Sequence, residues 1–439
     1  MSLLNIGFSG LNAAQIALNV AAQNIANVNT PGYSRQEATL GSLSGFGRLD
    51  NGMGVEVTGV RRITDEYLVS QHWRSRSASG ASDAFHQYIN ATEQLLGSES
   101  MSISKGMDLF FSSLSAALDS PETSAQRSQI IGSAEALANR FGQLNESMLT
   151  QEKQLAGQLD STISQVNGHL KQVAELNVQI GEQISKGVNT SALEDSREEV
   201  IRELSALMEV RVNKQNDGSL SLSLPQGQPL VMTGSSSTLS LTGDKLSLRF
   251  GPQSFAVPKL QGGTLAGMLE YRSTVLRPLR GELDQMAKKL ADSVNTKLGA
   301  GIDLNGNVGK PLFSYDPLNP SGSLTISSGF TGDDLAFAKG EGGAGDNSNL
   351  KELLTIKDGQ YDAYIGLLGR VAVQSGQAKA SMEADVNMEK DLANKLSSIS
   401  GVNADEEGAN IMAYTKTYQA NAKVISTSDQ LFNSILNMF

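Results

Sequence analysis

The residues best suited to catalysis or metal binding are few in this chain and widely separated. Its 439 residues include three histidines, His72, His86 and His169, and no cysteine. Thiol catalysis, disulfides and thiolate metal sites are therefore excluded. The histidines match no zinc-protease spacing, and neither a G-x-S-x-G motif nor a Walker A loop occurs. We therefore expect neither enzymatic activity nor a cofactor or bound metal.

Three short segments resemble functional motifs but are better explained by structure. GEGGAG at residues 340–345 matches G-x-G-x-x-G, yet no strand–helix–strand unit surrounds it, which favours a loop. DLNGN at 303–307 begins like a calcium loop, but its glycine is misplaced and Ser314 replaces the bidentate glutamate. DEE at 405–407 stands where a helix should begin, and negative charge there suits the helix dipole. The lone Trp73, close to several arginines in the sequence, is interpreted as a packing residue.

The charge of the chain excludes two classes of partner. The formal net charge is -11, whereas nucleic acids and anionic membrane surfaces reward clustered lysine and arginine. No apolar run is long enough to span a bilayer, so we expect no membrane insertion. The N-terminus also lacks the charged and apolar regions of a secretory signal. If the protein leaves the cell, we expect another export route.

The two ends of the chain share a sparse charge content and a seven-residue repeat. Residues 2–34 contain no Asp, Glu, Lys or Arg, although these make up 18% of the chain. The N-terminal repeat is formed by Leu4, Leu11, Leu18 and Ile25, with Gly7, Ala14, Ala21 and Val28 at the partner positions and Asn5, Asn12 and Asn19 along its flank. The C-terminal repeat is formed by Ile411, Tyr418, Ile425, Phe432 and Phe439, with Leu436 beside it. Matched repeats predict that the terminal helices pair as a coiled coil; the alternative is that each packs separately on a globular core.

A turn ends the first helix. Thr30 precedes Pro31 and is pushed out of the helical region, and Pro31-Gly32 suits a type II turn. The helix should therefore stop near Val28 or Asn29. Because short uncharged helices are marginal in water, we expect residues 1–30 and 405–439 to be poorly ordered in the free monomer and to fold on assembly.

Between its ends the chain is predicted to be mainly α-helical with a small β-rich insert. An apolar 3.6-residue period from Pro121 to about Lys186 predicts one helix roughly 90–100 Å long. Alternating leucines with Asn-Asp-Gly and Gly-Asp turns predict an antiparallel β unit after residue 210, and the helix from Thr264 should bend at Pro278. We predict an elongated, multidomain molecule with these parts: residues 1–35 with 400–439 as a terminal coiled coil; 36–82 as an extended or β connector; 83–209 with 263–300 and 351–399 as a long-helix bundle, its last helix starting at about 360; 210–262 as a small β-rich outer domain; and 301–350 as a Gly/Asp-rich loop or short-strand segment.

The terminal segments resemble a known family. ALNVAAQNIANVNTPGYSRQ, residues 17–36, is similar to the signature shared by bacterial flagellar axial proteins of the rod, hook and junction. SGVNADEEGANIMAYTKTYQANAKVI, residues 400–425, resembles more narrowly the hook-associated proteins of the hook–filament junction. These motifs cover the two ends, whereas residues 210–350 carry little recognisable signature. Ala404 and Gly408 depart from the family pattern only at the start of the last helix.

The resemblance implies a secreted, non-enzymatic building block of the bacterial flagellum, located at the hook–filament junction. Family members leave by flagellar type III export, with a cytosolic chaperone bound to their C-terminal region. They form a ring of about eleven head-to-tail copies between the hook protein and the second junction protein. Their paired terminal helices form the inner tube, so we expect the repeat residues above, the three asparagines and Leu436 to form the subunit interface, with Thr30, Pro31 and Gly32 turning the chain out of the tube.

Two other interpretations remain open. The protein could be an adhesin-like surface protein that binds through the β insert, although residues 210–260 offer no aromatic-rich binding face. It could instead be a hook or rod type of axial protein, although the long helices between 121 and 208 argue against that.

Overall fold

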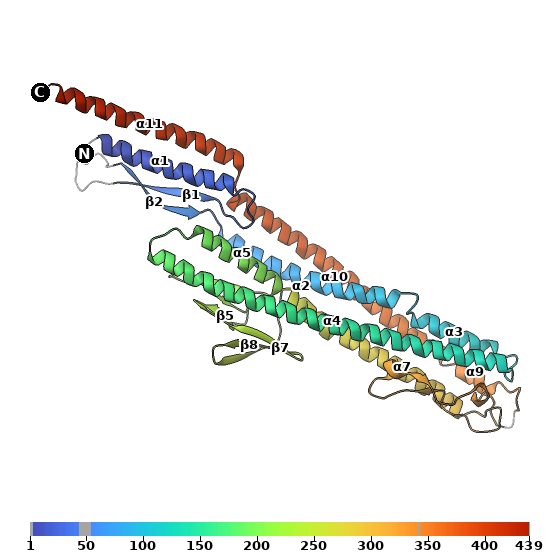
Figure 1. Cartoon of the computed structure of the whole chain (residues 1–439). Coiled ribbons are helices and arrows are strands. Elements are labelled where there is room, and N and C mark those ends of the chain that lie inside the picture. The colour runs from blue at the N-terminus through green and yellow to red at the C-terminus, as the bar shows by residue number, and fades with distance from the viewer. Residues whose placement is uncertain (1–2, 44–53, 341–342, 439) are drawn as a thin grey trace. The chain divides into compact units, whose positions relative to one another are not determined.

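The computed structural model describes residues 3–43, 54–340 and 343–438, and the chain divides into two compact units. Unit 1 comprises Met1–Gly80, Ile163–Gly263 and Ala384–Phe439, and unit 2 comprises Ala81–Thr162 and Thr264–Glu383. Helices dominate and all paired strands are antiparallel, which confirms the predicted fold class (Figure 1). No helix in the described ranges is both long and apolar enough to cross a membrane. Phe439, the last repeat position, and residues 341–342 of the GEGGAG segment lie outside the described residues.

Three long helices contribute residues to both units: α2 (Glu66–Gly97), α4 (Ser124–Ser185) and α10 (Lys357–Ser400). The single long helix predicted from Pro121 is present as α4, although it begins three residues later. Its first turn follows a turn at residues 121–122, where the Pro121 carbonyl accepts a hydrogen bond from Arg127 Nε at 2.6 Å. The period of buried apolar residues therefore located the helix well, whereas the proline start signal placed its N-terminus too early.

The predicted extended connector is too long, because α2 begins at Glu66 and not near residue 83. The Asp65 carboxylate accepts hydrogen bonds from the backbone amides of Tyr67 and Leu68, at 2.9 and 3.1 Å, and so caps the helix. The buried face of the first turns carries polar residues, among them His72 and Ser75, beside Trp73. This mixed face hid the helical period in the sequence. Only β1 (Gln36–Ser42) and β2 (Val55–Arg62), an antiparallel pair with a bulge at Thr39/Leu40, are extended.

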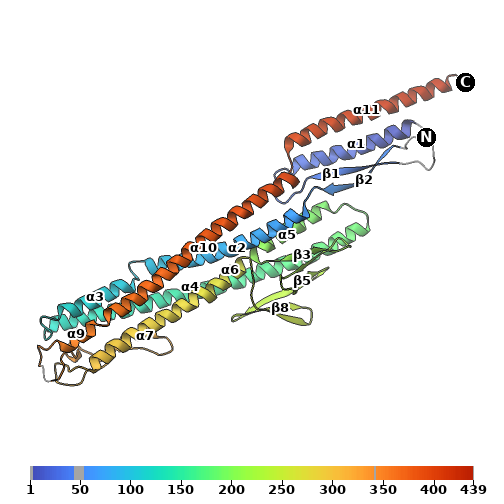
Figure 2. The same cartoon turned by 180° about the vertical axis from the view of Figure 1, so that it is seen from behind.

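In unit 1, the β insert forms two small antiparallel sheets beside α5 (Ser191–Leu207) and its half of α4 (Figure 2). The first has the order β3 (Arg211–Lys214), β4 (Leu220–Ser223), β5 (Pro229–Met232) and β6 (Ser235–Ser236); the second has the order β7 (Thr238–Thr242), β8 (Lys245–Phe250) and β9 (Gln253–Val257).

Two asparagines of α4 attach these sheets to the helix. Asn167 pairs with both backbone groups of Leu239, at 2.9 and 2.7 Å, and Asn177 pairs with both of Leu220, at 2.8 and 3.0 Å. Each asparagine side-chain amide thus makes the backbone hydrogen bonds that a neighbouring strand would otherwise make.

Unit 2 is a helix bundle with one end built from loops. It contains α3 (Ile103–Ala116), α6 (Thr264–Tyr271), a π-helix η1 (Arg272–Leu276), α7 (Arg277–Gly299), β10 (Phe313–Ser314), α8 (Pro320–Ser323), β11 (Thr325–Ile326), a 3-10 turn η2 (Gly332–Asp334) and α9 (Ser348–Leu354). The π-helical turn η1 lies just before Pro278, where proline cannot donate the hydrogen bond that the regular ladder needs, and the bend expected there stays a prediction. Residues 303–307, which only resemble the start of a calcium loop, form a simple turn. Asp303 Oδ1 accepts hydrogen bonds from the backbone amides of Asn305 and Asn307, both at 2.8 Å.

Buried Arg127 fixes the loops at that end. Its guanidinium donates to the carbonyls of Gly332 and Leu335 at 2.9 and 2.8 Å, and it lies 4.7 Å from the ring centre of Phe337. Burial lowers the pKa of Arg127, and the charges of Asp333, Asp303 and Glu122 oppose that effect. One arginine thus joins the start of α4 to the loop around η2, whose Leu335 and Phe337 are buried.

Candidate assembly surface

The first and last helices, α1 (Leu3–Ala26) and α11 (Ala404–Leu436), lie side by side within unit 1, with both chain ends on the same side (Figure 1). Gly7 faces Ile425 and Gly10 faces Asn421, so the two helices run antiparallel. A Cβ atom on Gly7 would stand 2.9 Å from Ile425 Cγ1, and one on Gly10 would overlap the Asn421 side chain. The close approach of the helices therefore depends on glycine at these positions.

Small residues form the buried face of α1. The described buried positions are Gly7, Gly10, Ala13, Ala14, Ala17, Val20, Ala21 and Asn24. The larger repeat residues lie beside this face: Leu11, Leu18 and Ile25 are half-buried and Leu4 is exposed. Val28 lies beyond the helix and is exposed. The leucines thus keep uncovered surface after α1 and α11 have paired.

The C-terminal repeat changes in exposure along α11. Ile411, Tyr418 and Ile425 are half-buried, whereas Phe432 and Leu436 are 63% and 58% exposed. Of the described residues of α11, only Glu407 is buried. The helix therefore packs on α1 along one side and leaves most of its remaining surface uncovered, and its last turns keep large apolar side chains in water.

The outer face of α1 is polar without being charged. Asn5, Asn12 and Asn19 are exposed there, and the helix contains no ionisable side chain. Burial of a charge in a protein interface costs several kcal/mol unless it is paired, whereas an amide needs only hydrogen bonds. This face could be covered by another protein surface at a low desolvation cost.

A hairpin and a turn hold the other side of α1. Asn24 is buried and pairs with both backbone groups of Gln36 in β1, at 2.9 and 3.0 Å, while its side-chain oxygen also accepts from the Tyr33 hydroxyl at 2.8 Å. Thr30, Pro31 and Gly32 form the expected turn: the Tyr33 amide donates to the Thr30 carbonyl at 3.2 Å, and Gly32 has φ 77°. Burial, together with Asp195 and Glu407, raises the pKa of Tyr33 to about 12, so its hydroxyl stays a donor.

A buried ion cluster joins the end of β2 in the hairpin to α5. Arg62, whose side chain is 10% exposed, contacts Asp195 at 2.7 Å, Glu198 at 2.6 Å and Glu194 at 3.5 Å. Burial raises the pKa of the Asp195 carboxyl, and Arg62 and Ser34 oppose that effect. Although burial alone would lower the pKa of Arg62, Glu198 and the other carboxylates raise it. The facing charges thus oppose the effect of burial on both Arg62 and Asp195.

A second ionic contact ties the segment just before β1 to α11. Arg35, the first charged side chain of the sequence, contacts Glu407 at 2.9 Å and Glu406 at 3.3 Å, and its amide donates to the Ser400 carbonyl at 2.8 Å. Asn403 caps α11 by accepting from the amides of Asp405 and Glu406, at 2.9 and 3.4 Å. The acidic segment 405–407 is therefore a helix start, as predicted.

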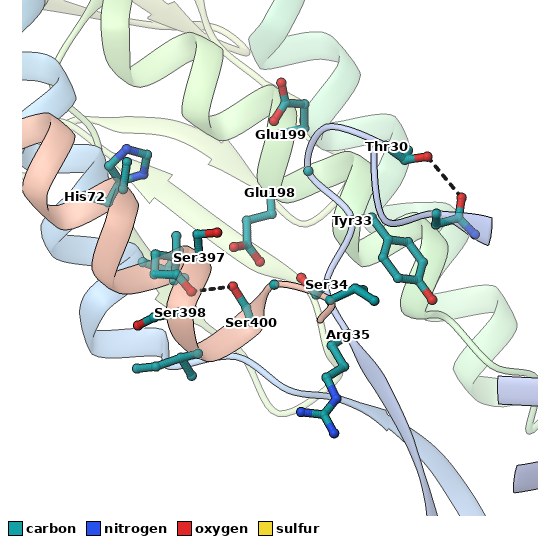
Figure 3. Close-up of a pocket in the computed structure, with 18 of the residues that line it drawn as sticks. Thr30, Tyr33, Ser34, Arg35, His72, Glu198, Glu199, Ser397, Ser398 and Ser400 are labelled. Carbon is teal, nitrogen blue, oxygen red and sulfur yellow. Dashed lines mark hydrogen bonds between the residues drawn. The ribbon is translucent and has the colours of Figure 1, made fainter. Parts of the chain in front are cut away.

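A cavity of about 520 Å³ lies among these contacts. Figure 3 shows its lining: Tyr33, Ser34 and Arg35 follow the turn, His72 comes from α2, Glu198 from α5 and Ser397 from α10. Burial lowers the pKa of His72, and Arg76 and Arg202 act in the same direction, while Glu389 opposes them. No group of three or more potential metal ligands occurs in the described part of the chain. We assign this cavity a structural role at the junction of four elements.

The sequence did not indicate the residues that hold this surface in place. In the sequence, Arg62 is one of two adjacent arginines and Asn24 lies within the motif of residues 17–36. Both act on partners distant in sequence, and no local pattern marks such a contact. The absence of charge in residues 2–34, by contrast, indicated that this segment belongs to a surface that another protein element covers.

Three sequence profiles match the chain. The flagellar hook-associated protein FlgK helical domain matches residues 89–313, the flagellar basal body rod FlgEFG protein C-terminal profile matches 395–438, and the flagella basal body rod protein profile matches 4–33. The two terminal matches coincide with α11 and α1.

Relatives over the full length carry one name. Flagellar hook-associated protein 1 of Salmonella typhimurium is 27% identical over 552 aligned residues and that of Escherichia coli 26% over 546, each covering 100% of both chains. The Bacillus subtilis protein of that name is 24% identical and covers 97% of this chain and 96% of its own. Among solved structures, the flagellar hook junction protein FlgK from Burkholderia pseudomallei aligns with a TM-score of 0.52 and 25% identity, over 56% of this chain and 47% of its own.

Proposed function

Because the chain belongs to the family of flagellar hook-associated proteins FlgK, we propose that it is a structural subunit that joins hook to filament in the bacterial flagellum. The observation that carries the proposal is the terminal helix pair: two matched rod-protein profiles fall on it, and α1 presents an uncharged outer face. Such a pair suits a tube wall, where each helix meets its partner and neighbouring copies.

The partners follow from the same assignment. The chain assembles with other flagellar axial proteins, with the hook protein on one side and the second junction protein on the other. Copies contact one another head to tail through Leu4, Leu11, Leu18, Ile25 and the flanking asparagines, and close into a ring of about eleven. A cytosolic chaperone holds the C-terminal region before export. The protein acts by binding and positioning, with no catalytic step.

Charge placed in the helix pair tests the proposal. Leu11→Asp or Ile425→Asp puts an unpaired carboxylate on a half-buried surface, which costs several kcal/mol once a neighbour covers it. We expect cells that produce only these variants to carry hooks without filaments, while the far-ultraviolet circular dichroism of the purified protein stays helical. Gln154→Asp, at an exposed position of α4, is the matched control and should support normal filaments. Filaments attached normally in both helix-pair variants would contradict the proposal.

A further inference from the structure

The last turns of α11 extend beyond α1. The register places Ile425 beside Gly7 and Asn421 beside Gly10, so the first described residue of α1, Leu3, lies opposite about residue 428. Every residue from 429 to 438 is exposed, and both figures of the whole chain show α11 continuing past the N-terminal end of α1. We call residues 429–438 the C-terminal overhang.

The overhang is apolar and almost uncharged. Its large side chains are Leu431, Phe432, Ile435, Leu436 and Met438, each more than half exposed, and Asp429 at its base is its only charge. A helix with such side chains in water is a surface that another protein element is expected to cover.

A groove of matching chemistry lies on the same unit. It has a volume of about 410 Å³ and runs between α1, α11 and the β1–β2 hairpin. Its floor is made of small α1 residues, Gly10, Ala13 and Ala17, and Leu40 and Val55 of the hairpin stand along one side. None of its lining residues is charged, and Leu40 is 52% exposed.

The overhang and the groove also agree in length. The groove follows α1 from Ile6 to Ala17, about 16 Å at 1.5 Å per residue, and residues 429–438 span about 14 Å on the same scale. The alanines of the floor, Ala13 and Ala17, leave space where Phe432 and Leu436, one turn apart on α11, would project, whereas Asn421 of the same chain already covers Gly10. Large side chains on one surface thus correspond to missing side chains on the other.

A copy cannot fill its own groove. Asn421 borders the groove, and Phe432 lies eleven residues further along the same straight helix, about 16 Å away. Each chain therefore carries one overhang and one groove that it cannot join to each other. A contact of this kind is heterologous, and repeated copies close into a ring or continue as a helix.

We propose that the C-terminal overhang of one copy docks in the groove of a second copy of this chain, with Phe432 and Leu436 against Ala13 and Ala17. The proposal rests on the function proposed above and adds the pair of surfaces through which neighbouring copies meet. It also explains why the groove and the overhang both lack charge: each is exposed only until the next copy arrives.

Cysteine cross-linking tests the contact directly, because the natural chain has no cysteine. The double variant Leu40→Cys/Phe432→Cys places one thiol beside the groove and one on the overhang. Disulfides form only when the two Cα atoms approach within about 4.4–6.8 Å. In flagella from cells that produce only this variant, we expect oxidation to yield a ladder of dimers and larger species on a non-reducing gel, which reductant collapses to the monomer.

The matched control is Gln154→Cys/Phe432→Cys. Gln154 is exposed on α4 and belongs to unit 2, outside the terminal helix pair, so we expect the monomer alone. If both variants give only the monomer while immunogold finds them at the junction, the docking proposal is overturned and the proposed function stands. If the unmodified chain is itself not found at the junction, the proposed function fails.

A charge pair gives a second, independent readout if the cysteine variants do not incorporate. Leu40→Glu and Leu436→Lys each place an unpaired charge in the contact, and we expect each alone to lower the fraction of hooks bearing filaments about tenfold. Together the two charges face each other, and most of the loss should be recovered. Additive losses in the double variant would contradict the contact.

Discussion

The buried ion cluster around Arg62 gives the sharpest test of how the terminal helix pair is attached to the rest of unit 1. Arg62→Leu removes the cation that faces Asp195, Glu198 and Glu194, at 2.7, 2.6 and 3.5 Å, and leaves the buried Asp195 and the two half-buried glutamates without that cation. Breaking a buried ion pair on one side destabilises by about 3–5 kcal/mol.

The neighbouring residue is the matched control. Arg61 contacts Glu37 at 3.0 Å, but the two side chains are 67% and 50% exposed. Such a surface pair contributes about 1 kcal/mol or less, so Arg61→Leu should be almost silent. The two variants remove the same side chain from adjacent positions of β2 and differ only in burial and in the number of carboxylates that they release.

The chain supplies its own probe for this measurement. Trp73 is the single tryptophan, is 8% exposed and belongs to unit 1, so its fluorescence reports unfolding of that unit. With an m-value of about 2 kcal/mol/M, a loss of about 4 kcal/mol lowers the urea midpoint by about 2 M. Arg61→Leu should shift the midpoint by less than about 0.5 M. Equal shifts for the two variants would refute the argument that burial makes this cluster structurally important.

Three further outcomes follow from the same unit. Gly32→Ala, at φ 77°, should lower the stability of unit 1 by about 1–2 kcal/mol, whereas Gly59→Ala, whose added Cβ meets no atom within 4 Å, should not. Urea unfolding curves followed by Trp73 fluorescence compare the two variants. Equal midpoints would contradict the claim that the turn requires glycine at position 32. The hydrogen bond from Arg202 lowers the pKa of Glu199 in the folded state, so this contact stabilises the fold above the unfolded-state pKa of Glu199 and ceases to do so as the pH falls through its folded-state pKa. The difference in urea midpoint between wild type and Glu199→Gln should therefore narrow below about pH 4. A difference that widens there would contradict the lowered pKa. Hydrogen exchange of α11 should be fast in the monomer, because only Glu407 of its described residues is buried, and slow in assembled flagella; strong protection in the monomer would contradict folding on assembly.

The helical architecture was accessible from the sequence wherever one periodic face is buried. Leu155, Leu159 and Val166 are fully buried in α4, and their spacing predicted the helix. The β insert and the Thr30–Gly32 turn were also predictable from the sequence, because alternating leucines and turn-forming residues determine local structure over a few residues. The start of α2 was missed because its buried face carries His72 and Ser75, which a search for apolar period does not register.

The positions that hold the terminal pair were less accessible, for a physical reason. Arg62 and Glu198 are 136 residues apart in the sequence, yet a hydrogen bond of 2.6 Å joins their side chains. No local sequence pattern encodes such a pairing. The leucine repeat was visible in α1, but only the structure shows that glycine and alanine form the buried face and that the leucines keep exposed surface. Lack of charge predicted that the segment is covered; it did not indicate which face meets which partner.

Labelling the protein along isolated flagella with immunogold tests the central claim most directly. A structural subunit that joins hook to filament predicts one narrow band of gold at the boundary between the two, on every flagellum that carries a filament. Gold distributed along the whole hook, the rod or the filament would contradict the assignment.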